Sequence, residues 1–250
     1  MLRPLIKLRH VGVLGALLAI APRPLAAQRV PDALPRYQVG AVDYAVIGVS
    51  ALASALPALL GDQLPYASCA PCDPSELWGI DRGAIGDIRS GPARMSDITM
   101  LATIGGGGAL TFMARGNQSR TAQWEDVAVY SQAVLITSAV TEWSKVLFQR
   151  PRPPRYGANA ANYPDPEYGR SFPSGHTSTT FAAAAAYASI LQRRGEAGKH
   201  TAEIVALFGA AALTGVLRVS AHKHFPTDVI AGAALGTAIG WAVPRLHRVQ

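Results

Sequence analysis

Three short stretches of the chain combine cationic side chains, histidines and a carboxylate, and each lies at the end of an apolar segment. They are Lys145 with Arg152 and Pro153, the run Pro173 to His176, and Arg218 with His224 and Asp228. Lysine and arginine supply fixed positive charge, and arginine presents paired donors that match phosphate oxygens. Antiparallel helices return alternate ends to one face of a bundle, so we expect the three stretches to meet there as a phosphate site.

The remaining residues of these stretches suit phosphoryl transfer. Ser174 and Gly175 directly precede an apolar segment, where the free N–H groups of a helix start favour an anion. One of the two histidines, His176 and His224, could attack phosphorus while the other protonates the leaving oxygen. Asp228 follows His224 by four residues and could accept the proton on the far imidazole nitrogen. This scheme needs no metal and no cofactor.

The composition favours an apolar protein with an anionic partner. Hydrophobic residues make up 49% of the 250 residues and charged residues only 16%, against about 25% in ordinary soluble domains. The net charge of +7 is not gathered into a basic stripe with interleaved aromatic residues, so we expect no nucleic-acid partner. An anionic substrate and anionic lipid headgroups account for the charge. Nothing in the sequence predicts an oligomeric state.

Six apolar segments are expected to be helices, because none shows the strict alternation of a strand and several are rich in alanine and leucine. They are Val42–Leu60, Ile98–Ala114, Val127–Phe148, Thr177–Leu191, Ala202–Val219 and Val229–Val243. The sequence therefore predicts an all-α bundle of about six core helices with the site at one end. A membrane-embedded bundle is favoured, although segments of this length also fit buried core helices.

The N-terminus is typical of an export signal. Positive residues precede an apolar run from Val11 to Ile20, and small residues up to Ala27 offer a cleavage site. We interpret 1–27 as a signal peptide, 28–93 as an N-terminal helix with a cysteine-containing loop, and 94–250 as the helical core. Outside the cytoplasm, Cys69 and Cys72 are expected to form a disulfide that staples this loop, rather than a redox motif or half of a zinc site.

The charges between the segments leave the topology open. Basic loops and the basic tail fall on one side of a six-span bundle, which the positive-inside rule makes cytoplasmic. A cleaved signal would place the mature N-terminus outside and invert that arrangement. We expect a protein of the bacterial cell envelope, either in the inner membrane with a periplasm-facing site or soluble in the periplasm. Arg155 and Arg170, in a loop rich in proline, are expected to be solvated.

The three stretches, in this order, resemble the type 2 phosphatidic acid phosphatase family, which is related to bacterial class A acid phosphatases and vanadium-dependent haloperoxidases. The family signature K-x6-R-P, P-S-G-H and S-R-x5-H-x3-D matches residues within 145–240, except that Leu217 replaces the serine before the arginine. The resemblance implies that His224 forms a phosphohistidine, that His176 is the general acid and that Asp228 orients His224. The phosphate ligands it implies are Lys145, Arg152, Ser174, Gly175 and Arg218.

The expected function is hydrolysis of a lipid phosphate or pyrophosphate, as a phosphoric monoester hydrolase acting at a membrane. Two alternatives remain at this stage, since they use the same anion pocket. One is a soluble periplasmic acid phosphatase that acts on small phosphate esters, and the other is a vanadium haloperoxidase. The identity of the substrate does not follow from residues that contact only its phosphate.

Overall fold

The computed structural model describes residues 34–115 and 119–249, and the expected signal peptide at 1–27 lies outside these ranges. Residues 35–250 cluster into one unit. Its described part contains seven α-helices and no sheet, with an isolated antiparallel bridge between Tyr37 and Val249. The helices are α1 (Ala41–Leu60), α2 (Gly79–Arg82), α3 (Ser90–Met113), α4 (Arg120–Phe148), α5 (Gly175–Arg193), α6 (Thr201–Ser220) and α7 (Pro226–Leu246). The prediction of an all-α fold is confirmed.

Each predicted segment lies within one of the six long helices, to within one residue at its ends, but α3 and α4 begin well before their apolar residues do. The first turns of α4 are polar because the side chains that they bury include a charged group, where apolar side chains would be expected. Asp126 is completely buried and forms ion pairs with Arg115 and Arg194. A search for apolar periodicity cannot detect such turns, since the stabilising partners lie on other elements.

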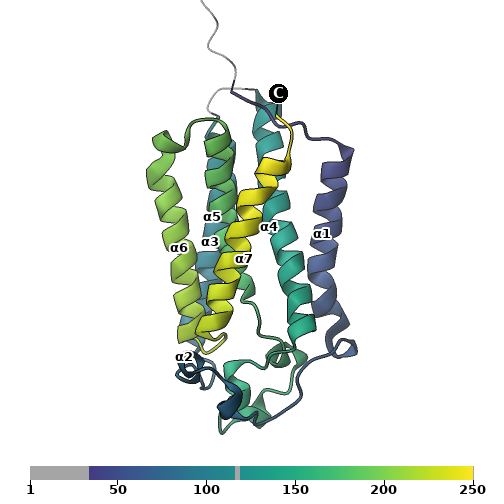
Figure 1. Ribbon diagram of the computed structural model, residues 1–250, viewed down its shortest axis with the longest axis vertical. Helices are drawn as coiled ribbons and strands as arrows, with labels where there is room; N and C mark the ends of the chain where they lie inside the picture. The colour runs from purple at the N-terminus through teal and green to yellow at the C-terminus, as the bar shows by residue number, and fades with distance from the viewer. Residues whose placement is uncertain (1–33, 116–118, 250) are drawn as a thin grey trace, which may run out of the picture. The chain divides into compact units, whose positions relative to one another are not determined.

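Helix α5 lies at the centre of the bundle and contacts α3, α4, α6 and α7 (Figure 1). Its middle is the alanine run 182–186, in which every residue is at most 2% exposed. Alanine keeps a high helix propensity while adding little width to the helix. The run therefore lets four neighbours approach one helix, while α1 packs on the outside against α4.

The closest approach in the bundle joins α5 to α7. Gly232, Gly236 and Gly240 repeat every four residues along α7 and face the backbone of α5. A Cβ atom on Gly232 would lie 2.7 Å from the carbonyl oxygen of Ser174, well inside an ordinary contact. The glycines thus allow backbone-to-backbone packing, which brings the first turn of α5 and the first turn of α7 together.

Within residues 34–115 and 119–249, three stretches are long and apolar enough to cross a membrane: Ala41–Gln63, Ala197–Ser220 and Pro226–Leu246. They contain α1, α6 and α7, whose outer faces expose large side chains such as Leu52, Val216 and Ile230. Helix α5 does not meet this criterion, although it is the most enclosed of the long helices. Serine and threonine side chains in its first turns lower its hydropathy.

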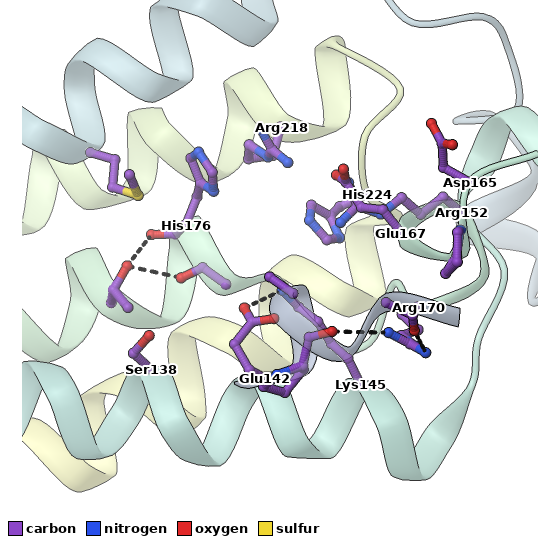
Figure 2. A pocket seen from close by; sticks show the side chains of 17 residues that line it. Ser138, Glu142, Lys145, Arg152, Asp165, Glu167, Arg170, His176, Arg218 and His224 are labelled. Carbon is purple, nitrogen blue, oxygen red and sulfur yellow. Dashed lines mark hydrogen bonds and ion pairs between the residues drawn. The ribbon is translucent and has the colours of Figure 1, made fainter. Parts of the chain in front are cut away.

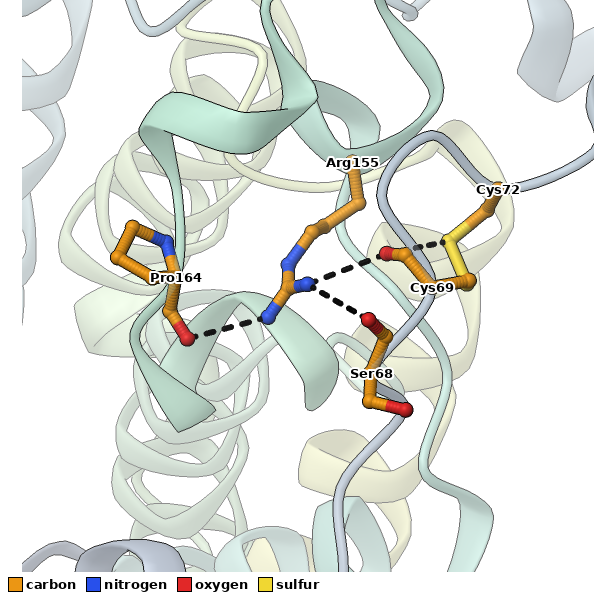
Figure 3. The surroundings of a disulfide bond; sticks show 5 residues. All are labelled: Ser68, Cys69, Cys72, Arg155 and Pro164. Carbon is orange, nitrogen blue, oxygen red and sulfur yellow. Dashed lines mark hydrogen bonds between the residues drawn. A yellow bond between two sulfur atoms is a disulfide. The ribbon is translucent and has the colours of Figure 1, made fainter.

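Two loop segments cover the end of the bundle where α4 ends and α5 begins (Figure 1). Their short 3-10 turns are Gly61–Gln63, Pro74–Glu76, Pro153–Tyr156, Ala160–Asn162 and Pro166–Gly169. Cys69 and Cys72 form a disulfide in the first segment. Beside it, Arg155 donates to the carbonyl oxygens of Ser68, Cys69 and Pro164 at 3.1–3.4 Å (Figure 3).

The expectation that the loop arginines are solvated is wrong. Arg155 is 3% exposed and Arg170 is 6% exposed. Arg170 donates to the carbonyl oxygens of Gly61 at 2.7 Å and Pro65 at 3.0 Å, where the chain leaves α1. Irregular backbone leaves carbonyl groups without helical partners, and a guanidinium offers five donors to satisfy them. Arg155 therefore joins the two loop segments to each other, and Arg170 joins them to the end of α1.

Candidate active site

Four helix ends meet beneath these loops: the ends of α4 and α6 and the starts of α5 and α7. They enclose a cavity of about 560 Å³, and Figure 2 shows its polar side chains converging from several elements. Six of the residues chosen from the sequence line it: Lys145, Arg152, Gly175, His176, Arg218 and His224. The other two, Ser174 and Asp228, are fully buried behind the wall.

Lys145 lies in the last turn of α4 and is 8% exposed. Its Nζ donates to Oε1 of Glu142 at 2.5 Å, one turn earlier on the same helix. A Cβ atom at Gly175 would lie 3.0 Å from that Nζ. Glycine at the start of α5 therefore leaves room for the lysine ammonium beside the first N–H groups of the helix, where both favour an anion.

Arg152 and Arg218 add to the positive lining, and each is 4% exposed. Arg152 follows α4 and pairs with Oε1 of Glu167 at 2.9 Å. Arg218, in the last turn of α6, lies 3.3 Å from Oγ of Ser96 and 3.8 Å from Oδ1 of Asp97. The Nε atoms of both arginines have no hydrogen-bond partner within the described ranges. Buried donors of this kind remain available to phosphate oxygens.

His176 is in the first turn of α5, and its Nε2 lies 2.7 Å from Oδ1 of Asp97 on α3. Because Asp97 also faces Arg218, one carboxylate connects the histidine with a cation of the cavity wall. The carboxylate of Asp97 can accept the N–H of this nitrogen, which holds the imidazole at the cavity wall.

His224 lies between α6 and α7 and is 1% exposed. Its Nδ1 lies 3.3 Å from Oγ of Ser171 and 3.4 Å from Oδ2 of Asp228. Ser171 donates its hydroxyl proton to the same Oδ2 at 2.5 Å, and the backbone N–H of Phe225 donates to it at 2.9 Å. Since Nδ1 faces this acceptor network, Nε2 of His224 is the nitrogen directed at the cavity.

The local sequence explains how Asp228 reaches that position. Pro226 occupies the first position of α7, where a missing N–H costs nothing. Asp228 is then the third residue of the helix, and its carboxylate accepts the N–H of the capping residue Phe225. The same carboxylate that stabilises the helix start therefore also faces His224.

Electrostatics in the cavity favour the neutral form of His224. Burial lowers the pKa of His224 well below 6.5, and the positive charges of Arg152, Arg218 and Lys145 lower it further. Arg152 likewise lowers the pKa of Glu167, which keeps this carboxylate ionised beside it. A neutral imidazole retains a lone pair for attack on phosphorus.

The sequence did not identify five polar residues that contact the predicted site residues: Asp97, Glu142, Arg150, Glu167 and Ser171. The three acidic residues lie next to the cations, but sequence spacing does not pair a carboxylate with a partner on another helix. Ser171 stands three residues before Ser174, and this nearness to a chosen motif is the only hint it offers. Among the described residues, no three His, Cys, Asp or Glu side chains cluster in a way that could hold a metal ion.

Comparisons with known proteins identify the family of the chain. The chain is 28% identical over 132 residues to lipid A 1-phosphatase of Porphyromonas gingivalis, a match that covers 52% of this chain and 26% of that protein. It is 32% identical over 133 residues to lipid phosphate phosphatase 1 of Arabidopsis thaliana, which covers 43% of this chain and 40% of the relative. The chain thus spans less than half the length of either relative.

A solved structure, that of a transmembrane PAP2-type phosphatidylglycerolphosphate phosphatase from Bacillus subtilis, is similar with a TM-score of 0.41 and 19% identity. The match covers 83% of this chain and 87% of the other. The family model of the PAP2 superfamily matches residues 126–250, half of the chain and all three motif stretches. The chain belongs to the PAP2 superfamily.

Proposed function

We propose that the protein is a metal-independent phosphohydrolase that removes phosphate from a lipid phosphate or pyrophosphate. The observation that carries the proposal is one cavity lined by cationic side chains and two histidines, at helix ends that the chain brings together from three distant stretches. Phosphoryl transfer requires positioned positive charge around the equatorial oxygens, with a nucleophile and an acid in line.

In the first step, Nε2 of His224 forms a bond to phosphorus as the bond to the leaving oxygen breaks. His176 gives its proton to that oxygen, while Ser171 and Asp228 accept the hydrogen bond from the Nδ1–H of His224. The positive charge that develops on the imidazole is thereby stabilised. In the second step, His176 takes a proton from water, the oxygen attacks phosphorus, and His224 departs as phosphate is released.

An apolar wall supports a lipid substrate over a small ester. Pro57 and Ala58 of α1 and Met100 of α3 line the same cavity as the cations. Helix α1 exposes large apolar side chains on its outer face, so an acyl chain could lie along it while the phosphate binds below. Two similar proteins are also named as lipid phosphatases.

The distribution of basic residues supports a cavity that opens on the side of the membrane away from the cytoplasm. The basic residues of 193–200 and 245–248 lie where α5 and α7 end, opposite the cavity. Positively charged residues at the membrane surface favour the cytoplasmic side. We therefore place the protein in the inner membrane of a bacterial envelope with the cavity facing the periplasm.

The test is phosphate release by the purified protein from a panel of lipid phosphates and from p-nitrophenyl phosphate, with and without EDTA. We expect faster turnover of a lipid phosphate, no loss with EDTA, inhibition by vanadate, and no turnover by His224→Ala. Preference for the small ester would favour a periplasmic acid phosphatase, and halide oxidation with vanadate and peroxide would favour a haloperoxidase. Normal turnover by His224→Ala would refute the mechanism.

A further inference from the structure

We propose that Asp81 and Arg150 are positioning residues for the His224–Asp228 pair, which makes catalysis depend on a segment that precedes the PAP2-matched residues. This segment, residues 64–89, is called the cap segment below. The inference rests on the proposed phosphohistidine mechanism. It adds two ion-paired residues outside the three family motifs, called the relay below, which contact Asp228, the carboxylate partner of His224.

Arg150 is the first link of the relay. Its Nη1 donates to Oδ1 of Asp228 at 2.6 Å, the carboxylate oxygen that does not face His224. Its guanidinium carbon lies 4.4 Å from the ring centroid of Phe225, the residue that follows the nucleophile. Arg150 therefore holds both the carboxylate and the loop that carries His224, while the neighbouring Arg152 lines the cavity itself.

Asp81 is the second link, in the short helix α2 of the cap segment. It is completely buried, and its Oδ2 accepts from Nη2 of Arg150 at 2.8 Å. The same carboxylate accepts from the backbone N–H of Thr227 at 3.1 Å and from its hydroxyl at 2.6 Å. Asp81 thus stabilises the N-terminus of α7, directly before Asp228, by contacts made from outside the helix.

The charges explain why this contact affects chemistry as well as folding. Arg150 is shared between two buried carboxylates, Asp81 and Asp228. Without the charge of Asp81, the whole positive charge of Arg150 would act on Asp228 and weaken it as an acceptor for the imidazole of His224. The phosphohistidine step needs that acceptor, because positive charge grows on the ring during attack.

The cap segment is built to hold Asp81 in place. Cys72, Leu77 and Ala84 of the segment form a small apolar cluster with Tyr156 and Phe225. The disulfide between Cys69 and Cys72 closes the loop next to this cluster, and Arg155 donates to the carbonyl oxygen of Cys69 at 3.1 Å. Packing, a covalent bond and hydrogen bonds therefore all fix the segment against the nucleophile loop.

The experiment compares three variants, which are Asp81→Asn, Arg150→Lys and the double variant that combines these two substitutions. The control variant is Asp87→Asn. Asp87 is a matched control, because it lies in the same segment, is exposed, and accepts hydrogen bonds from Asn159 and Tyr163, which lie outside the His224–Asp228 network. Turnover of a lipid phosphate gives kcat and KM. We expect kcat to fall by roughly ten- to a hundredfold in Asp81→Asn, with KM changed less than twofold and Asp87→Asn close to wild type.

Arg150→Lys should lower kcat in the same way, and the double variant should be no slower than the slower single variant, since both residues act through Asp228. The inference would be overturned if Asp81→Asn kept the kcat of the wild type, or if Asp87→Asn lost as much kcat as Asp81→Asn. It would also be overturned if the fold losses in kcat of the two single variants multiplied in the double variant. Loss of the folded state in both single variants, judged by Tm, would overturn it too. His224→Ala separates the two proposals: if it is inactive while Asp81→Asn is normal, only the relay fails.

Discussion

Gly232→Ala is the substitution whose effect can be worked out most directly from the structure. The new Cβ atom would lie 2.7 Å from the carbonyl oxygen of Ser174, whereas ordinary contact begins at 3.4 Å, so α5 and α7 must separate by about 0.7 Å. The neighbouring atoms are backbone and cannot turn away. Overpacking of this kind costs about 1–3 kcal/mol, which predicts a lower Tm.

The same displacement should slow catalysis, because Ser174 begins α5 next to His176 and Gly232 lies one turn after Asp228. A misplacement near 1 Å costs on the order of a hundredfold in rate, so we expect kcat for a lipid phosphate to fall by roughly ten- to a hundredfold. The measurements are a thermal melt in detergent and phosphate release at saturating substrate.

Gly209→Ala on α6 is the matched control. A Cβ atom there meets nothing within 4 Å, and alanine favours a helix over glycine. Its Tm and kcat should therefore equal or slightly exceed those of the wild type. If Gly232→Ala behaved like Gly209→Ala in both assays, the close packing of α7 on the start of α5 would be refuted.

Three further outcomes are expected. Because burial and the cations hold the pKa of His224 well below 6.5, the acidic limb of kcat/KM should lie well below pH 6.5, and an inflection at 6.5 would contradict the assigned environment. The unfolded chain binds a proton at this residue as the pH falls through 6.5 and the folded chain does not, so the free energy of unfolding should decrease below pH 6.5. Ser171→Ala should lower kcat by roughly tenfold, through loss of a hydrogen bond to a charged group, and unchanged kcat would exclude the bridge to Asp228. Replacing Cys69 and Cys72 by serine should remove about 2 kcal/mol of stability, as expected for a short closed loop; an unchanged Tm would show that the disulfide does not stabilise the cap segment.

The local sequence was sufficient to predict the all-α fold and six of the residues that line the cavity. Helical periodicity and apolar content are properties of neighbouring residues, so six helices were recognisable without their partners. Lys145, Ser174 and Arg218 could be grouped because each lies at a segment end and the segments alternate in direction. Pro226 and Asp228 mark a helix start for reasons confined to one turn.

The partners of the loop arginines were decided by tertiary structure alone. Arg150 and Arg152 stand two residues apart in similar sequence surroundings, yet one binds Asp228 and Asp81 while the other lines the cavity. Arg155 was expected in solvent and is buried, because carbonyl groups of a distant loop need its donors. Side-chain pairing depends on which elements fold next to each other, and that proximity is set by the packing of the whole bundle rather than by spacing along the chain.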